Sequence, residues 1–198
     1  MAYTTTALCK TYMGITASAD DTLIGTLVTR AQAMVDNYVG RTFEAGSDST
    51  KRFDAVRNVF GRFLVFDGGL ELAQAPTTIT NGDATVLVVN TDVVLNPWNS
   101  YPVYALELMP SSSNVWQYDA AGNPQRAISI VGRWAYSVTA PDDVVAVMVR
   151  LVSFLYRQRE NSADYDRPVS VSDGMVLMPG KLPADIASIL QPYRRFAT

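Results

Sequence analysis

The sequence predicts an α+β fold in which a small helical bundle, built from the N- and C-terminal segments, carries an inserted antiparallel β-rich subdomain. Three observations lead to this prediction. Residues 19–39 repeat apolar side chains at helical spacing, residues 50–131 divide into short β-rich runs, and helical spacing returns after residue 139. We expect residues 1–48 and 140–198 to form the helical core and residues 49–139 to form the inserted subdomain.

The long N-terminal helix is predicted over residues 19–39. Ser18 and Asp21 have the spacing of a capping box, and Gly40 suits the left-handed conformation that ends a helix. The apolar stripe of this helix comprises Leu23, Ile24, Leu27, Val28, Ala31, Met34, Val35, Tyr38 and Val39.

A shorter helix is predicted before it, over residues 4–13, with Gly14 at its end. We expect Leu8 and Tyr12 to face inward. Cys9 is the single cysteine of the chain, which excludes an intrachain disulfide, and we interpret it as a small buried hydrophobic residue.

The β-rich insert is punctuated by turns. Asn81-Gly82 lies between two β-rich runs and predicts a hairpin, and residues 120–124 predict a second turn. The predicted strands lie at residues 52–56, 62–66, 77–80, 85–89, 103–108, 115–118 and 127–131.

The C-terminal part begins with a second long helix, capped at Thr139 and running to about residue 160. An edge hairpin around Asp173-Gly174 is predicted over residues 169–178. Pro183 opens a last short helix, which we expect Pro192 to terminate before Tyr193.

Catalytic chemistry has few candidates in this sequence. The chain has no histidine, which excludes His-dependent triads and His-based metal sites. The acid pairs Asp20-Asp21 and Asp142-Asp143 stand at helix starts, where the helix dipole favours carboxylates. We therefore expect no enzyme activity, no cofactor and no metal, with a hydrolase that uses Asp142 and Asp143 as the alternative within the enzyme class.

Aromatic residues concentrate in the β-rich insert, where they could form core or stack on a ligand. They support an alternative function, a carbohydrate- or receptor-binding module. The aromatic residues concerned are Trp98, Trp116, Trp134, Tyr101, Tyr104, Tyr118 and Tyr136.

Charge and hydropathy exclude two further classes. The formal net charge is −3, so the surface as a whole has no strong attraction for nucleic acid or for an anionic membrane. No apolar run is long enough for a membrane span, and the N-terminus does not have the pattern of a signal peptide. We expect a protein made in the cytoplasm that has no membrane partner.

Three segments resemble the head-tail connector, or adaptor, proteins of tailed bacteriophages. Residues 20–43 are similar to the first long helix of that family and its Gly-Arg exit. Residues 130–144, with the helix that continues to Arg157, resemble its strand-to-helix junction. Residues 182–194 are similar to its final helix and tail.

The resemblance implies a structural virion protein of the neck, assembled in the host cytoplasm, with twelve copies in a ring. Its partners would be the portal protein, a tail-side neck or tail-completion protein, and double-stranded DNA that passes through the lumen without sequence-specific binding. The implied portal-binding residues are Pro192, Tyr193, Arg194, Arg195 and Phe196. We expect subunits to pack through helices that carry Leu23, Leu27, Met34, Tyr38, Met148, Leu151 and Leu155.

Overall fold

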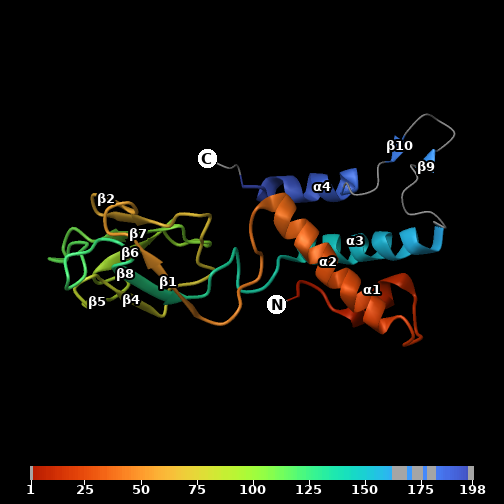
Figure 1. The fold of residues 1–198 in the computed structure, drawn as a ribbon, viewed down its shortest axis with the longest axis horizontal. Helices are drawn as coiled ribbons and strands as arrows, with labels where there is room; N and C mark the ends of the chain where they lie inside the picture. Colours follow the sequence, from red (N-terminus) through yellow and green to blue (C-terminus); the bar gives the residue numbers. More distant parts are fainter. Residues whose placement is uncertain (1, 162–168, 171–175, 178–181, 196–198) are drawn as a thin grey trace. The chain divides into compact units, whose positions relative to one another are not determined.

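The computed structural model describes residues 2–161, 169–170, 176–177 and 182–195 of the 198-residue chain. It has a mixed α+β fold with two compact units (Figure 1). Residues 41–139 form the first, called here the β unit. The second, called here the helical unit, comprises residues 2–40 and 140–198.

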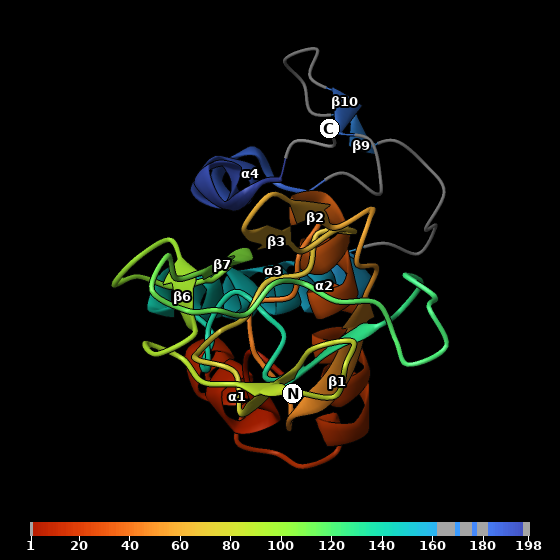
Figure 2. The ribbon, with the colours of Figure 1, turned by 90° about the vertical axis from the view of Figure 1, so that its left-hand side faces the viewer.

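The helical unit is built around its longest helix, α3 (Asp142–Asn161), which contacts the three other helices. Figures 1 and 2 both show α3 between α4 and α1. The other helices are α1 (Thr6–Met13), α2 (Asp21–Val39) and α4 (Ala184–Leu190). Five residues of α2 are buried in the helical unit, namely Ile24, Val28, Ala31, Val35 and Val39.

The predicted end of α2 is confirmed and its predicted start is wrong. Gly40 has φ 70°, and its N–H donates to the carbonyl of Asp36 at 2.8 Å. Ser18 lies in the turn before the helix, where its carbonyl accepts from Asp21 N, and Asp20 is the N-cap residue. The Asp20 carboxylate accepts a hydrogen bond from Tyr156 of α3 at 2.8 Å, so this helix start is fixed by a tertiary contact.

The C-terminal elements follow the prediction with one change. Strands β9 (Val169–Ser170) and β10 (Val176–Leu177) pair antiparallel, while the predicted turn at Asp173-Gly174 lies outside the described residues. Helix α4 ends at Leu190, and residues 191–193 continue as the 3-10 turn η1 (Gln191–Tyr193), which includes Pro192. Proline is tolerated there because the first residues of a helical turn need no N–H donor.

The β unit contains two four-stranded antiparallel sheets, with orders β1-β8-β4-β5 and β2-β3-β7-β6. Their strands are β1 (Ser49–Phe53), β2 (Val59–Phe60), β3 (Phe63–Val65), β4 (Thr78–Thr80), β5 (Val86–Leu87), β6 (Val93–Asn96), β7 (Ala105–Leu108) and β8 (Ile128–Gly132). Buried residues of both sheets belong to one hydrophobic core, to which Ile79 and Ile130 contribute from one sheet and Leu64 and Leu106 from the other. The unit therefore has a core of its own.

The Asn81-Gly82 hairpin is confirmed, and its turn has a second role. Asn81 is 2% exposed, and its side chain accepts from Gln117 N at 3.0 Å and donates to Val115 O at 2.8 Å. Residues 115–118, predicted as a strand, join no sheet because this asparagine takes the place of a neighbouring strand. Strands β2 and β6 were not predicted.

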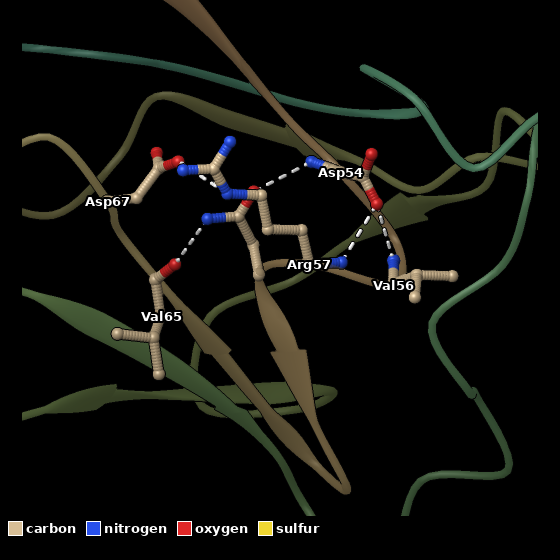
Figure 3. Close-up of polar contacts among 6 residues, drawn as sticks. Asp54, Val56, Arg57, Val65 and Asp67 are labelled. Carbon is tan, nitrogen blue, oxygen red and sulfur yellow. Dashed lines mark hydrogen bonds and ion pairs between the residues drawn. The ribbon is translucent and has the colours of Figure 1, made fainter.

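The loop after β1 is held by side chains that bond to the backbone (Figure 3). The Asp54 carboxylate accepts from the N–H groups of Val56 at 2.7 Å and Arg57 at 2.9 Å. The Asn58 amide accepts from Asp54 N at 2.9 Å and donates to Val65 O at 3.1 Å. The N–H groups of Arg57 and Val56 lower the pKa of Asp54.

The two ends of the β unit run side by side. Tyr136 N donates to Thr42 O at 2.9 Å, and Ala45 N donates to Ser137 O at 3.0 Å. The rings of Phe43 and Tyr136 meet edge to face, with centroids 5.7 Å apart. The chain therefore enters and leaves this unit at one place.

Candidate functional site

The predicted partner-binding segment at the C-terminus is docked on its own helical unit. The Tyr193 hydroxyl donates to the Asp143 carboxylate at 2.7 Å, at the start of α3. The Arg194 guanidinium lies 5.6 Å from the centre of the Tyr38 ring, near the end of α2. Arg195 N donates to the carbonyl of Val39 at 2.9 Å. Residues 193–195 thus contact both the C-terminal end of α2 and the N-terminal end of α3.

These contacts supply partners for polar groups at the two helix ends. The last carbonyls of a helix have no partner within it, and the N–H of Arg195 bonds to one of them on α2. Positive charge is favourable near a helix C-terminus, which suits the guanidinium over Tyr38. Pro192 and Arg194 remain exposed, while Tyr193 and Arg195 are half-buried. Phe196, the last predicted portal-binding residue, lies outside the described residues.

The helix residues predicted to pack between subunits fall into two groups. Met148 and Leu151 are fully buried within the helical unit, so they form its own core. The other five, Leu23, Leu27, Met34, Tyr38 and Leu155, are half-buried. The four on α2 form a stripe beside the fully buried one. Part of the surface of these five side chains is exposed and is available for a further contact.

An apolar groove on the helical unit was not predicted. It has a volume of about 420 Å³ and lies between α1 and α3, where Leu8, Tyr12, Val145 and Val149 contribute its apolar wall. Leu8 is 45% exposed and Tyr12 is 57% exposed, so the prediction that they face inward is wrong. The fully buried residue of α1 is Cys9, as predicted.

The position of Cys9 explains the orientation of α1. Its side chain is fully buried, and burial raises the pKa of its thiol, an effect that the hydrogen bond to Thr4 opposes. Residues one position apart on a helix point about 100° apart, so burying Cys9 turns Leu8 away from the core. Tyr12 lies on the Leu8 side of Cys9 and is exposed with it. A thiol kept protonated is a poor nucleophile.

Three of the four carboxylates in the two acid pairs have structural partners. Asp21 pairs with Lys10 at 2.5 Å and Asp20 accepts from Tyr156. Asp143 accepts from Tyr193 and, at 2.9 Å, from Val144 N. Among the described residues, no group of three or more acidic or cysteine side chains could hold a metal ion. None of the helices in the described part of the chain is both long and apolar enough to span a membrane.

The three tryptophans of the β unit differ in their environment. The Trp116 indole donates to Arg62 O at 2.9 Å, and the Trp134 indole donates to Ser49 O at 2.8 Å while its ring packs on Phe66. Both are partly buried against the core. Trp98 is 66% exposed. Core packing therefore accounts for two of the three indoles.

Comparison with known proteins gives distant structural similarities. No protein-family model matches the chain, and no curated protein matches it. A solved structure of the neck of a native gene transfer agent particle, computed with C12 symmetry, is similar with 14% identity and a TM-score of 0.48, over 87% of this chain and 84% of that one. A chain of the virion of a native gene transfer agent particle is similar with 13% identity and a TM-score of 0.49, over 98% of this chain and 90% of that one.

Proposed function

We propose that this chain is a structural protein of a phage-like virion, without enzyme activity, that forms a ring between the portal and the tail. Twelve copies surround a channel for double-stranded DNA, the C-terminal segment binds the portal, and a tail-side protein attaches to the ring. Assembly takes place in the host cytoplasm. In this proposal residues 1–48 and 140–198 form the connector core and residues 49–139 form an inserted domain.

The observation that carries the proposal is the apolar groove between α1 and α3. Leu8 and Tyr12 expose large apolar side chains beside Val145 and Val149. Contiguous exposed apolar surface is typical of protein–protein contacts, and such a surface gains free energy when a neighbour covers it. Asp142 and Arg150 border the groove, so charged side chains lie beside an apolar centre, as in many subunit interfaces.

The three segments that resemble connector proteins support the same function. Residues 21–39, 142–161 and 184–193 form α2, α3 and α4 with η1, and all belong to the helical unit. The C-terminal segment ends there with exposed Pro192 and Arg194 side chains. Proline, arginine and tyrosine together offer a partner a rigid, charged and aromatic surface, and tyrosine and arginine are enriched among the residues that dominate binding energy.

The deciding measurement is the mass of the purified protein, alone and mixed with its cognate portal, by light scattering and negative-stain imaging. We expect a ring, either free or formed on the portal. A monomer that ignores the portal would overturn the proposal. Leu8→Glu with Tyr12→Glu should prevent ring formation, because two carboxylates in an apolar contact lose hydration. Val86→Glu is the control, since Val86 is 58% exposed on the β unit.

A further inference from the structure

A shallow pocket of about 320 Å³ lies on the β unit. It is formed by the turn between β5 and β6, by β6 itself and by the loop after it. Trp98 and Tyr101, which are 66% and 52% exposed, supply its aromatic surface. Asn90, Asn99 and Ser100 supply its polar groups.

The loop that carries the aromatic residues is anchored at both ends. Tyr104 N donates to Asn96 O at 3.0 Å, which closes the loop at its base. Val103 exchanges two backbone hydrogen bonds with Leu72, at 2.8 and 2.9 Å. Hydrogen bonds therefore fix the backbone of the loop that carries Trp98 and Tyr101. Neither ring belongs to the hydrophobic core of the β unit.

The chemistry of the lining selects the class of ligand. None of the ten lining residues is charged, which disfavours phosphates, carboxylates and cations as ligands. Within residues 41–139, all of which the structure describes, the side chains of Asn90, Asn99 and Ser100 form no hydrogen bond. They can donate and accept toward a ligand. The site thus combines flat apolar rings with neutral donors and acceptors.

We propose that this pocket binds a neutral saccharide. A pyranose ring has an apolar C–H face, which packs on the rings of Trp98 and Tyr101, and hydroxyl groups at its rim, which bond to Asn90, Asn99 and Ser100. Ligand sites in proteins commonly combine apolar lining with a few polar groups that fix orientation. The proposal is independent of ring formation, since it concerns residues 75–101 of the β unit only.

The test is titration of the full-length protein with three neutral trisaccharides, of glucose, mannose and N-acetylglucosamine, followed by tryptophan fluorescence and calorimetry. We expect saturable binding of at least one, with a blue shift as Trp98 leaves water. Trp98→Ala should weaken that binding at least about tenfold, since stacking on an aromatic ring contributes on the order of one factor of ten. Asn99→Gly removes the amide and keeps the left-handed backbone, which has φ 57°, and should also weaken binding.

Tyr104→Ala is the matched control, because Tyr104 is 51% exposed and does not line the pocket. It should bind the saccharide as the unaltered protein does. Circular dichroism should be the same for all variants. Any one of three results overturns the proposal. The first is no binding of any trisaccharide at millimolar concentration, and the second is binding that Trp98→Ala leaves unchanged. The third is loss of an assembled state in Trp98→Ala without saccharide binding, which would make the pocket an interface between copies.

Discussion

The guanidinium of Arg41 lies 3.8 Å from the carboxylate of Glu71, and both side chains are largely buried, at 15% and 5% exposure. The guanidinium also lies 5.0 Å from the centre of the Tyr136 ring. This ion pair joins the first residue of the β unit to a residue thirty positions later, beside the place where the chain leaves that unit. A buried pair of this kind is costly to break, because the remaining charge stays in a poorly solvated place.

Arg41→Met should therefore lower the free energy of unfolding by about 3 kcal/mol, measured by urea denaturation. Glu71→Leu should have a similar effect. The double variant should lose less than the sum of the two single ones, because neither charge is then left behind. Additive losses would show that the two side chains do not interact.

Removal of residues 191–198 should leave the subunit folded and abolish portal binding. The segment contributes the Tyr193–Asp143 and Arg195–Val39 hydrogen bonds, each with a net effect of about 1 kcal/mol. Thermal melting and pull-down with the cognate portal measure the two effects. Asp143→Ala is the control, since it removes the bond to Tyr193 from the α3 side, leaves residues 191–198 in place and should keep portal binding. Undiminished pull-down of portal by the truncated protein would contradict the assignment.

Gly82 has no room for a side chain. A Cβ atom placed there would lie 2.1 Å from the carbonyl oxygen of Gln117, in the segment that Asn81 holds. Gly82→Ala should lower the stability of the β unit by at least about 1–3 kcal/mol, since the backbone must move. Gly46→Ala is the matched control, because a Cβ there meets nothing within 4 Å and its φ is not left-handed. Equal melting temperatures for the two variants would refute the close approach.

Three loop carboxylates of the β unit should make its stability fall in acid. Backbone N–H groups lower the pKa of Asp54, of Asp92, where Val88 N is the main donor, and of Asp119, where Asn123 N is. A carboxyl whose pKa is lower in the folded state stabilises that state above its unfolded pKa, near 4, and this contribution disappears as pH falls through the folded pKa. Denaturation between pH 5 and pH 2 should show less pH dependence for Asp119→Asn than for the unaltered protein.

Asp36 should behave in the opposite way. Burial raises the pKa of this carboxyl, although the hydrogen bond from Tyr3 at 2.5 Å opposes the rise. Its contribution to stability is complete below the unfolded pKa and is lost as pH rises through the folded pKa. Asp36→Asn keeps an acceptor for Tyr3 and removes a negative charge near the end of α2. It should raise the melting temperature at pH 7 and make little difference at pH 3.

The long helices could be predicted from the sequence because their signals, periodic apolar residues and a terminal glycine, lie within the helix or next to its end. The stripe of α2 and the left-handed Gly40 are examples. The start of α2 could not be predicted so well, since Asp20 is fixed by Tyr156, which lies 136 positions away. The same holds for residues 115–118, whose β-like composition gives no sign that Asn81 binds their backbone.

The interaction surfaces were harder to predict for a related reason. In α1, Leu8 with Tyr12 and Cys9 with its neighbours offer two apolar sides to the core, and the sequence does not say which one is covered. Leu8, Tyr12 and Cys9 are all predicted to face inward, and of these three only Cys9 is buried. For the aromatic residues, the sequence did not say which belong to the core. The structure packs Trp116 and Trp134 against the core and leaves Trp98 exposed.

The adjacent ends of the β unit have a consequence for how such a chain could arise. Because Thr42 and Tyr136 are hydrogen-bonded neighbours, the whole of the intervening segment could be gained, lost or exchanged at one place in the chain. Its two sheets could then diverge under selection different from that on the helices. A swap of this segment between distant relatives would need only the few residues around Phe43 and Ser137 to be matched.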